Sequence, residues 1–456
     1  MARLTDEQQY LRMTGTPVAK LVTSMALPTV GGMLVTSFYN ITDTFFVSQL
    51  GTSASAAVGV VFSVQSLIQA VGFTLAMGSG SMISRRLGQK DRESACRFVS
   101  TAFLMAFAFG ALLGVLGLAF LQPLMRVLGS TETMLPYSCG YARYILLSAP
   151  IFSASFVLNV AMKAEGRATL SMLGLGAGNL LNVALDPLFI FGLGMGTAGA
   201  ALATALSQCA GFCTLLWFFL KKQDTLRIRW SYVSRDVGDY LTIIRVGSPT
   251  LCRQGCGSIA SALLNNRAMA FGDGAVAAMS IANRIYNMVR SVLVGLGQGF
   301  QPVAGFNYGA KRPERVKGAF RFTVILGTAV ASLSAAALAL WAPQVMALFR
   351  RDDPEVIRMG ARAIRMLCAV LPLLGYSTYV NQMLQCLGRS GKATFLASCR
   401  QGTLYVPLML ALSSALGFLG IQLCQPAADG LTFLISVPFH LWFFRSPKGL
   451  KQCEKS

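Results

Sequence analysis

The chain has 456 residues, of which 54% are hydrophobic and 12% are charged, and its mean hydropathy is +0.57. This composition excludes a soluble globular protein and indicates an integral membrane protein. The formal net charge of +21 would suit a nucleic-acid-binding protein. However, most basic residues lie on connections between apolar segments, where anionic lipid is the simpler partner.

Twelve apolar stretches follow a polar segment, residues 1–16, which shows no cleavable signal pattern. Each is long enough to cross the hydrocarbon core as a helix, which takes about 20 residues. They span residues 17–48, 56–80, 98–121, 138–162, 170–192, 196–220, 241–267, 275–303, 318–341, 360–384, 395–415 and 417–444. The sequence therefore predicts an all-α membrane protein with twelve transmembrane helices.

The second half of the chain repeats the first, and an offset of 221 residues places Pro249 on Pro28. The same alignment pairs Gly51 with Gly272, Gly88 with Gly309, Lys90 with Lys311 and, after one added residue, Asn159 with Asn381 and Gly166 with Gly388. We therefore predict a parallel repeat of two six-helix lobes, residues 17–220 and 241–444, joined by a linker, 221–240, and followed by a tail, 445–456. Internal repeats of this kind are typical of secondary transporters.

The basic residues fall mainly on one side of the membrane when the N-terminus is placed inside. The inner connections carry basic clusters at residues 85–97 and 311–321, and Arg400 is counted with them. This bias predicts a multi-pass protein of the cell (inner) membrane with both termini in the cytoplasm. It also favours the lipid bilayer over nucleic acid as the partner of the basic surface.

The most informative residues are the polar ones inside apolar stretches. Asp43 lies in the first stretch, and Asp186 lies in the fifth with Asn182 one helical turn before it on the same face. A carboxylate at mid-membrane costs at least about 2.5 kcal/mol, so it is expected to be neutralised by a proton or a cation. The alternative is that these aspartates form structural hydrogen bonds only.

Prolines occur in the same two stretches as the aspartates. Pro28 and Pro187 each remove a backbone donor and leave a carbonyl without its helical partner. We expect both positions to allow the helices to bend, with the proviso that most prolines in transmembrane helices form static kinks.

Other chemistry is not indicated by the sequence. Cysteine pairs four residues apart, such as Cys252 and Cys256, have no histidine beside them and read as small buried apolar residues. The segment from Gly388 to Lys392 lacks the spacing and the hydroxyl residue of a phosphate-binding loop. We therefore expect no enzymatic activity and no cofactor, and any transport would depend on an ion gradient.

Over its whole length the chain resembles the multidrug and toxic compound extrusion (MATE) family. The resemblance depends on the six-plus-six repeat and on motifs in four of the first six helices. These motifs are Pro28 with Asp43, the segment from Asn159 to Gly166-Arg167, Asn182-Val-Ala-Leu-Asp186-Pro187, and Gly199-Ala-Ala-Leu-Ala-Thr204. The resemblance implies a V-shaped pair of lobes, export of cationic amphipathic compounds, and a cation site in the N-terminal lobe. That site would comprise Asp43, Asn159, Asn182, Asp186 and Thr204, and Pro28 would mark the bend of the first helix.

The C-terminal lobe departs from one branch of that family. Members of the branch carry acidic residues in the seventh and tenth helices, whereas here neither helix holds a carboxylate. Any coupling ion is therefore expected in the N-terminal lobe, and Na⁺ would bind at Asp43, Asn182 and Asp186. The C-terminal lobe instead holds Arg253, Arg284 and Arg290, whose predicted roles are contacts with carbonyls or phosphate headgroups, or structural packing.

These observations favour a monomeric secondary antiporter that exports cationic drugs in exchange for H⁺ or Na⁺ by alternating access. Aromatic and methionine side chains are predicted to line an adaptable cavity, although core or lipid packing is an alternative role for them. The candidates for this cavity are Met33, Phe38, Tyr39, Phe156, Met288 and Tyr379. A flippase for lipids or lipid-linked saccharides with the same two-lobed plan is the rival function, and it would require a strongly cationic cavity.

Overall fold

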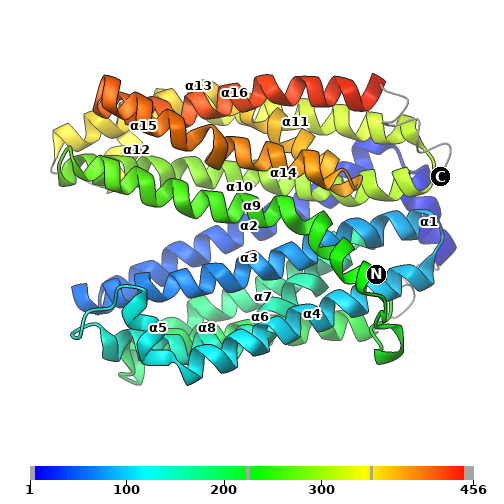
Figure 1. Cartoon of the computed structure of the whole chain (residues 1–456), viewed down its shortest axis with the longest axis horizontal. Coiled ribbons are helices and arrows are strands. Elements are labelled where there is room, and N and C mark those ends of the chain that lie inside the picture. The colour runs from blue at the N-terminus through cyan, green and yellow to red at the C-terminus, as the bar shows by residue number, and fades with distance from the viewer. Residues whose placement is uncertain (1–5, 222–225, 350–352, 446–456) are drawn as a thin grey trace. The chain divides into compact units, whose positions relative to one another are not determined.

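The computed structural model describes residues 6–221, 226–349 and 353–445, and it places them in helices joined by short connections (Figure 1). Parts of the predicted linker and tail, residues 222–225 and 446–456, lie outside the described residues, as do residues 1–5 and 350–352. Nine helices in the described part of the chain are long and apolar enough to cross a membrane.

The first half contains six long helical segments. They are α2 (Val18–Ser48), α3 (Thr52–Gly88), α4 (Arg92–Ala119), α6 (Leu135–Ala164), α7 (Ala168–Pro187) with the π-helical turn η1 (Leu188–Gly192), and α8 (Gly196–Lys221). Two short helices accompany them, α1 (Asp6–Gly15) and α5 (Leu121–Val127).

The second half repeats this order after the single turn η2 (Trp230–Tyr232). Its long segments are α9 (Val237–Met269), α10 (Asp273–Gly309), α11 (Pro313–Leu340), α13 (Pro354–Cys386), the interrupted helix α14 (Ser390–Ser398), η3 (Cys399–Thr403) and α15 (Tyr405–Leu416), and α16 (Phe418–Arg445). A short helix, α12 (Ala342–Phe349), stands where α5 stands in the first half.

The prediction of twelve helical spans in two related sets of six is confirmed. Three of the twelve spans are not among the nine helices that are long and apolar enough to cross a membrane, and their sequences explain the difference. The helices α9 and α10 carry arginines and amides in their interiors, while α14 and α15 are separated by η3 and are individually too short.

The repeat extends to unusual backbone conformations. Lys90 and Lys311, which correspond across the repeat, both adopt positive φ, at 60° and 56°. Gly166 and Gly388 correspond in the same way, with φ values of 82° and 79°. Side chains rarely adopt this region unless the chain turn requires it, so the same tight connections have been kept in both halves.

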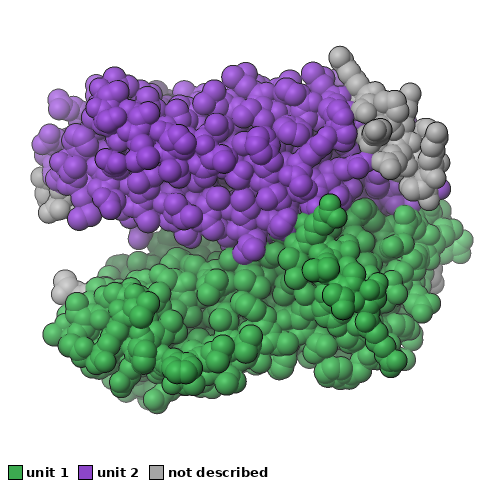
Figure 2. Space-filling view, in the orientation of Figure 1, with its two compact units in different colours: residues 1–15, 31–247 green, residues 16–30, 248–456 purple. Residues whose placement is uncertain are grey.

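By packing, the chain divides into two compact units (Figure 2). Unit 1 comprises residues 1–15 and 31–247, and unit 2 comprises residues 16–30 and 248–456. The division falls inside α2, three residues after Pro28, and inside α9, just before Pro249. Each unit therefore contains part of the first helix of the other half.

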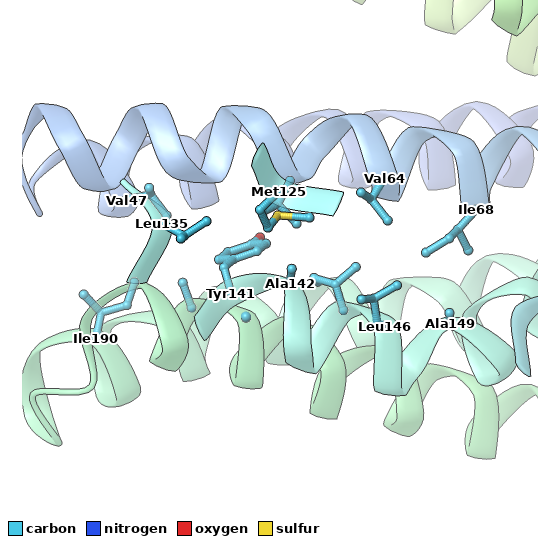
Figure 3. Packing of buried hydrophobic residues seen from close by; sticks show 14 residues of the cluster. Val47, Val64, Ile68, Met125, Leu135, Tyr141, Ala142, Leu146, Ala149 and Ile190 are labelled. Atoms are coloured by element: carbon cyan, nitrogen blue, oxygen red, sulfur yellow. The ribbon is translucent and has the colours of Figure 1, made fainter. Parts of the chain in front are cut away.

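The core of unit 1 is a cluster of buried apolar side chains from α2, α3, α5, α6, η1 and α8 (Figure 3). Tyr141 on α6 lies in its centre and is 2% exposed. Small residues let the helices approach closely, as a Cβ atom at Gly110 on α4 would fall 2.5 Å from the carbonyl oxygen of Ala149. Close approach of this kind replaces the hydrophobic driving force that lipid does not provide.

The segment between the two halves packs on unit 1. The backbone N–H of Ser234 donates to Thr101 Oγ1 at 2.9 Å, and Arg97 pairs with Asp239 at 3.1 Å. The N–H of Leu226 donates to the buried carboxylate of Glu165 at 2.9 Å. The described part of the predicted linker is thus held by specific contacts to α4 and to the turn between α6 and α7.

Candidate functional site

A buried polar cluster in unit 1 is centred on Asn182 of α7. Its Nδ2 donates to Asp186 Oδ1 at 3.2 Å, one turn further along the same helix, and to Thr204 Oγ1 of α8 at 3.3 Å. All three side chains are buried, with exposed fractions of 1%, 0% and 1% in the order Asn182, Asp186 and Thr204. The i, i+4 spacing in α7 therefore produces the side-chain pair that the sequence predicted.

Asp43 of α2 joins this cluster from a different helix. It is half-buried, and its carboxylate lies close enough to Asp186 for the two negative charges to interact. Tyr39, one turn earlier on α2, has both carboxylates, Thr204 and Gln65 as electrostatic neighbours. The structure thus brings four of the five predicted cation-site residues together: Asp43, Asn182, Asp186 and Thr204.

Three oxygen atoms of the cluster are buried without a hydrogen-bond partner among the described residues: Asp43 Oδ1, Asp186 Oδ2 and Asn182 Oδ1. Among those residues, no lysine or arginine forms an ion pair with either aspartate. Buried oxygens are normally satisfied, and each one left over calls for an explanation. Carboxylate and amide oxygens are the atoms that coordinate a hard cation, and a carboxylate oxygen can instead bind a proton.

The fifth predicted residue, Asn159, makes a different contact. Its Nδ2 donates to the Ser171 hydroxyl at 2.6 Å and to the Ser171 carbonyl at 3.2 Å, linking α6 to α7 across the Gly166 turn. Its repeat partner, Asn381, donates to the carbonyl of Ala393 at 2.5 Å, and Ala393 occupies the repeat position of Ser171. A duplicated bond accounts for both asparagines without an ion, and a place for Asn159 in the cation site stays a prediction.

The two predicted bend positions have different surroundings. The helix α2 continues through Pro28, and the division between the packing units follows shortly after it. Pro187 ends α7 and is followed directly by the π-helical turn η1. Wider turns of this type are common where a helix has lost a backbone bond and near functional sites.

The predicted cavity residues differ widely in how much of each side chain is exposed. Phe156 packs in unit 1 against Phe73 and Phe152, with ring centroids 4.2 Å and 4.8 Å away. Tyr379 is fully buried in unit 2. By contrast, Phe38 and Met288 are 63% and 51% exposed, and Met33 and Tyr39 are half-buried. The exposed and half-buried members keep a predicted role in substrate contact, whereas Phe156 and Tyr379 belong to the cores of their units.

The sequence reasoning missed a second charged cluster, in unit 2. Arg400 Nε donates to Asp429 Oδ1 at 2.7 Å, and Arg400 Nη2 donates to Tyr286 Oη at 3.0 Å. Arg400 was assigned to the inner connections by the charge count, and this was wrong, because it lies in η3 with an exposed fraction of 9%. Asp429 could have been found by the rule that identified Asp186, since it too is a carboxylate within an apolar stretch.

Duplicated six-helix units with an acidic cluster among buried helices define a secondary transporter by their architecture. The MatE family model matches the chain twice, over residues 28–188 and 249–410. The chain belongs to the MatE family, whose members are multi-pass membrane transporters and not enzymes.

Individual relatives agree with this assignment over nearly the whole chain. The multidrug export protein MepA of Staphylococcus aureus is 26% identical over 442 residues, covering 95% of this chain and 97% of that protein. A solved structure described as the outward-facing conformation of a multidrug resistance MATE family transporter of the MOP superfamily matches with a TM-score of 0.90 at 26% identity. It covers 98% of this chain and 99% of that one.

Another similar structure is that of a MOP superfamily transporter from Pyrococcus furiosus, described by a reverse polarity of its binding pocket that suggests a different function. Its TM-score is 0.87 at 28% identity, and the match covers 94% of this chain and 98% of that chain.

Proposed function

We propose that the protein is a secondary antiporter that exports cationic amphipathic compounds in exchange for H⁺ or Na⁺. The observation that carries this proposal is the set of three oxygens on Asp43, Asp186 and Asn182 that have no hydrogen-bond partner within the described part of the chain, in a cluster to which that part supplies no basic ion-pair partner. The names of relatives described as multidrug export proteins support the export of drugs.

The cluster would work as an ion-exchange site. Two carboxylates removed from water repel each other and are poorly solvated, so a bound proton or Na⁺ stabilises them. Asn182 holds Asp186 in place through its Nδ2, and the Oδ1 of Asn182 remains available to a cation. A cationic compound would be attracted by the same charges, so that ion and substrate favour different states of the protein.

The first helix would transmit the change. Asp43 lies in the part of α2 that packs with unit 1, whereas residues 16–30 of the same helix pack with unit 2. A change in packing at Asp43 would therefore act, through a continuous helix that contains Pro28, on a segment held by the other unit. Coupling requires only that the ion and the substrate prefer different conformations, each open to one side of the membrane.

Efflux from proteoliposomes tests the proposal. A fluorescent cationic dye would be followed with an imposed pH gradient, a Na⁺ gradient, both or neither. We expect one gradient to drive dye movement in the wild-type protein, and the double variant Asp43→Asn with Asp186→Asn to lose it. Glu132→Gln, which removes an exposed carboxylate near α5, is the matched control. Gradient-driven transport by the double variant would refute the site.

We further propose that the protein lies in the cell membrane with both termini in the cytoplasm, on the basis of the excess of basic residues on one set of connections. Reporter fusions to the C-terminal tail, with one reporter active only inside the cell and one active only outside, test the orientation. Activity of the outside reporter alone would overturn it.

A flippase for lipids or lipid-linked saccharides is the second candidate, and the observation that favours it is that Arg253, Arg290 and Arg400 all lie inside helical spans of unit 2. An anionic cargo would require positive charge along its path. The polarity reversal attributed to the Pyrococcus furiosus relative supports the view that members of this superfamily differ in this respect. A drug-resistance test in an efflux-deficient strain separates the candidates, since a flippase would confer no resistance.

A further inference from the structure

Unit 2 carries more positive than negative charge inside its helical spans, where Arg400 and Asp429 are buried and Arg253 and Arg290 are half-buried. Three arginines, Arg253 on α9, Arg290 on α10 and Arg400 on η3, lie well inside helical spans, together with Asp429 on α16. Arg253 and Arg290 are each sixteen or more residues from both ends of their helices, about 24 Å along the axis at 1.5 Å per residue. Both therefore lie near the middle of their spans, where an unpaired charge is costly.

Both oxygens of Asp429 accept hydrogen bonds from residues other than Arg253 and Arg290. Its Oδ1 accepts from Arg400 Nε at 2.7 Å and from Gln425 Nε2 at 3.0 Å, and its Oδ2 accepts from the Tyr286 hydroxyl. Among the described residues, no carboxylate pairs with Arg253 or Arg290. Within the described part of unit 2, Arg253 and Arg290 thus have no ion-paired carboxylate, and they stand beside the Arg400–Asp429 pair.

Helix packing places Arg253 near Arg400. Ser248 on α9 hydrogen-bonds Thr394 on α14 at 2.8 Å, and further along the same two helical segments Gly257 meets the side chain of Gln401. Arg253 lies between these contacts, one turn before Gly257, and so comes level with η3. Its charge interacts with that of Arg400.

Arg290 reaches the same place from α10. It lies one turn beyond Tyr286, on the same helical face, and Tyr286 bonds both Arg400 and Asp429. Arg290 has Arg400, Arg253 and Asp429 as electrostatic neighbours. The three guanidinium groups therefore converge, and η3 turns Arg400 toward them in a π-helical segment of the type often found at functional sites.

The repeat shows that this charge is specific to the second half. Arg253, Arg290 and Arg400 correspond to Gly32, Gln69 and Gly178, while Asp43 corresponds to Leu264. The duplicated helices thus support a negative cluster in unit 1 and a net positive cluster in unit 2. Conserved packing would account for similar residues in both halves, but it does not account for opposite charges.

We infer that Arg253 and Arg290, beside the Arg400–Asp429 pair, form a binding site for the oxyanion group, carboxylate or phosphate, of an amphipathic compound. Guanidinium groups bind such groups through paired charge-assisted hydrogen bonds. The oxyanion neutralises the excess positive charge, and its apolar remainder is stabilised among the helices. The site extends the range of bound compounds to anions and zwitterions, whether or not the acidic cluster of unit 1 works as proposed.

Binding to the full-length protein in phosphatidylcholine nanodiscs tests the inference. The probe is dansylamino-undecanoic acid, compared with its uncharged methyl ester. We expect the acid to bind at least about tenfold more tightly than the ester, since one charge-assisted hydrogen bond is worth this much. The double variant Arg253→Gln with Arg290→Gln should remove that difference and leave ester binding unchanged. Equal binding of acid and ester to the wild-type protein would overturn the inference.

Matched variants separate this site from general effects of charge. Arg284→Gln removes an exposed arginine from the same helix α10 and should keep the preference for the acid, and a similar loss in this variant would contradict the site. Arg290→Lys should keep part of the preference. Glu132→Gln, at an exposed carboxylate, should leave binding unaltered. Because binding is measured without an ion gradient, failure of this site is distinguished from failure of the proposed antiport.

Two sources of the anion are distinguished by adding phosphatidylglycerol to the nanodiscs. If a lipid headgroup occupies the site, the anionic lipid should compete with the acid in the wild-type protein and not in the double variant. If the site prefers the carboxylate of a free compound, affinity for the acid should be unaffected by the lipid. Equal competition in both proteins would show that the lipid acts elsewhere and would count against a headgroup in the site.

Discussion

Asn182 Nδ2 lies 3.2 Å from Asp186 Oδ1, whereas Asn182 Oδ1 and Asp186 Oδ2 have no hydrogen-bond partner among the described residues. The amide thus fixes the carboxylate through one pair of atoms and leaves the second pair available. This division of contacts allows a site to be held in position before its ion arrives, which lowers the cost of ordering it on binding.

We predict that Asn182→Ala reduces gradient-driven efflux by at least about tenfold, because a hydrogen bond to a charged group contributes about 1.5–3 kcal/mol. Thr204→Val should have a smaller effect, since the hydroxyl that accepts from Asn182 is a neutral group. Initial rates at a saturating gradient provide the measurement, and size-exclusion profiles control for folding. An equal loss in both variants would show that Asn182 has no separate role.

The duplicated asparagine bonds lead to a prediction about stability. Asn159→Ala and Asn381→Ala should each lower the free energy of unfolding by about 1–3 kcal/mol, because each leaves a buried acceptor without its donor. Thermal unfolding in detergent measures the two losses. We expect them to be similar, as Asn159 and Asn381 tie corresponding helices in the two halves. A large loss of ion affinity with Asn159→Ala at unchanged stability would instead place Asn159 in the cation site.

The fold could be predicted from the sequence because the apolar stretches are long and their order is repeated in the second half of the chain. The apolar stretches locate the spans, and the offset between Pro28 and Pro249 defines two related sets. The residues of one helix were predicted equally well, since Asn182 and Asp186 are separated by one turn. Their approach to Asp43 was suggested by family resemblance, as spacing along the chain does not determine which helices are neighbours.

The second cluster shows where this reasoning fails. Arg400 lies close to the beginning of its apolar stretch, so the charge count assigned it to the connection before it. Its partner, Asp429, is 29 residues away on another helix. Each of these charges can be buried only because the other neutralises it, whereas a hydropathy profile scores each residue without its partner in space. Asn159 is a similar case, because a polar residue in a span has the same signature whether it binds an ion or a carbonyl.

The Arg400–Asp429 pair gives a third prediction. Asp429→Asn should destabilise the protein by about 3–5 kcal/mol, because it leaves the buried Arg400 guanidinium without a counter-ion. The double variant Arg400→Leu with Asp429→Leu should be destabilised less, since it removes both charges together. Unfolding midpoints of the two variants measure the contrast. A double variant as unstable as Asp429→Asn would show that packing around these side chains, and not charge, determines the loss.

Glu165, in the turn between α6 and α7, gives a prediction about pH. Burial raises the pKa of its carboxyl from 4.5 to about 7, although Arg167 and the Leu226 N–H oppose the rise. The folded protein therefore holds the proton more tightly than the unfolded chain does. Stability contributed by this group is complete below pH 4.5, falls as the pH rises towards 7, and is constant above that value.

Glu165→Gln should remove this dependence and keep an oxygen that accepts from Leu226. The difference in unfolding midpoint between variant and wild type should increase in favour of the variant from pH 5 to pH 7, by an amount equivalent to at most about 3 kcal/mol. Thermal unfolding across this range provides the measurement. Glu132→Gln, at an exposed carboxylate, should give curves parallel to the wild type. Parallel curves for Glu165→Gln as well would mean that Glu165 is ionised in the folded protein at pH 5, and that its contact with Leu226 does not depend on protonation.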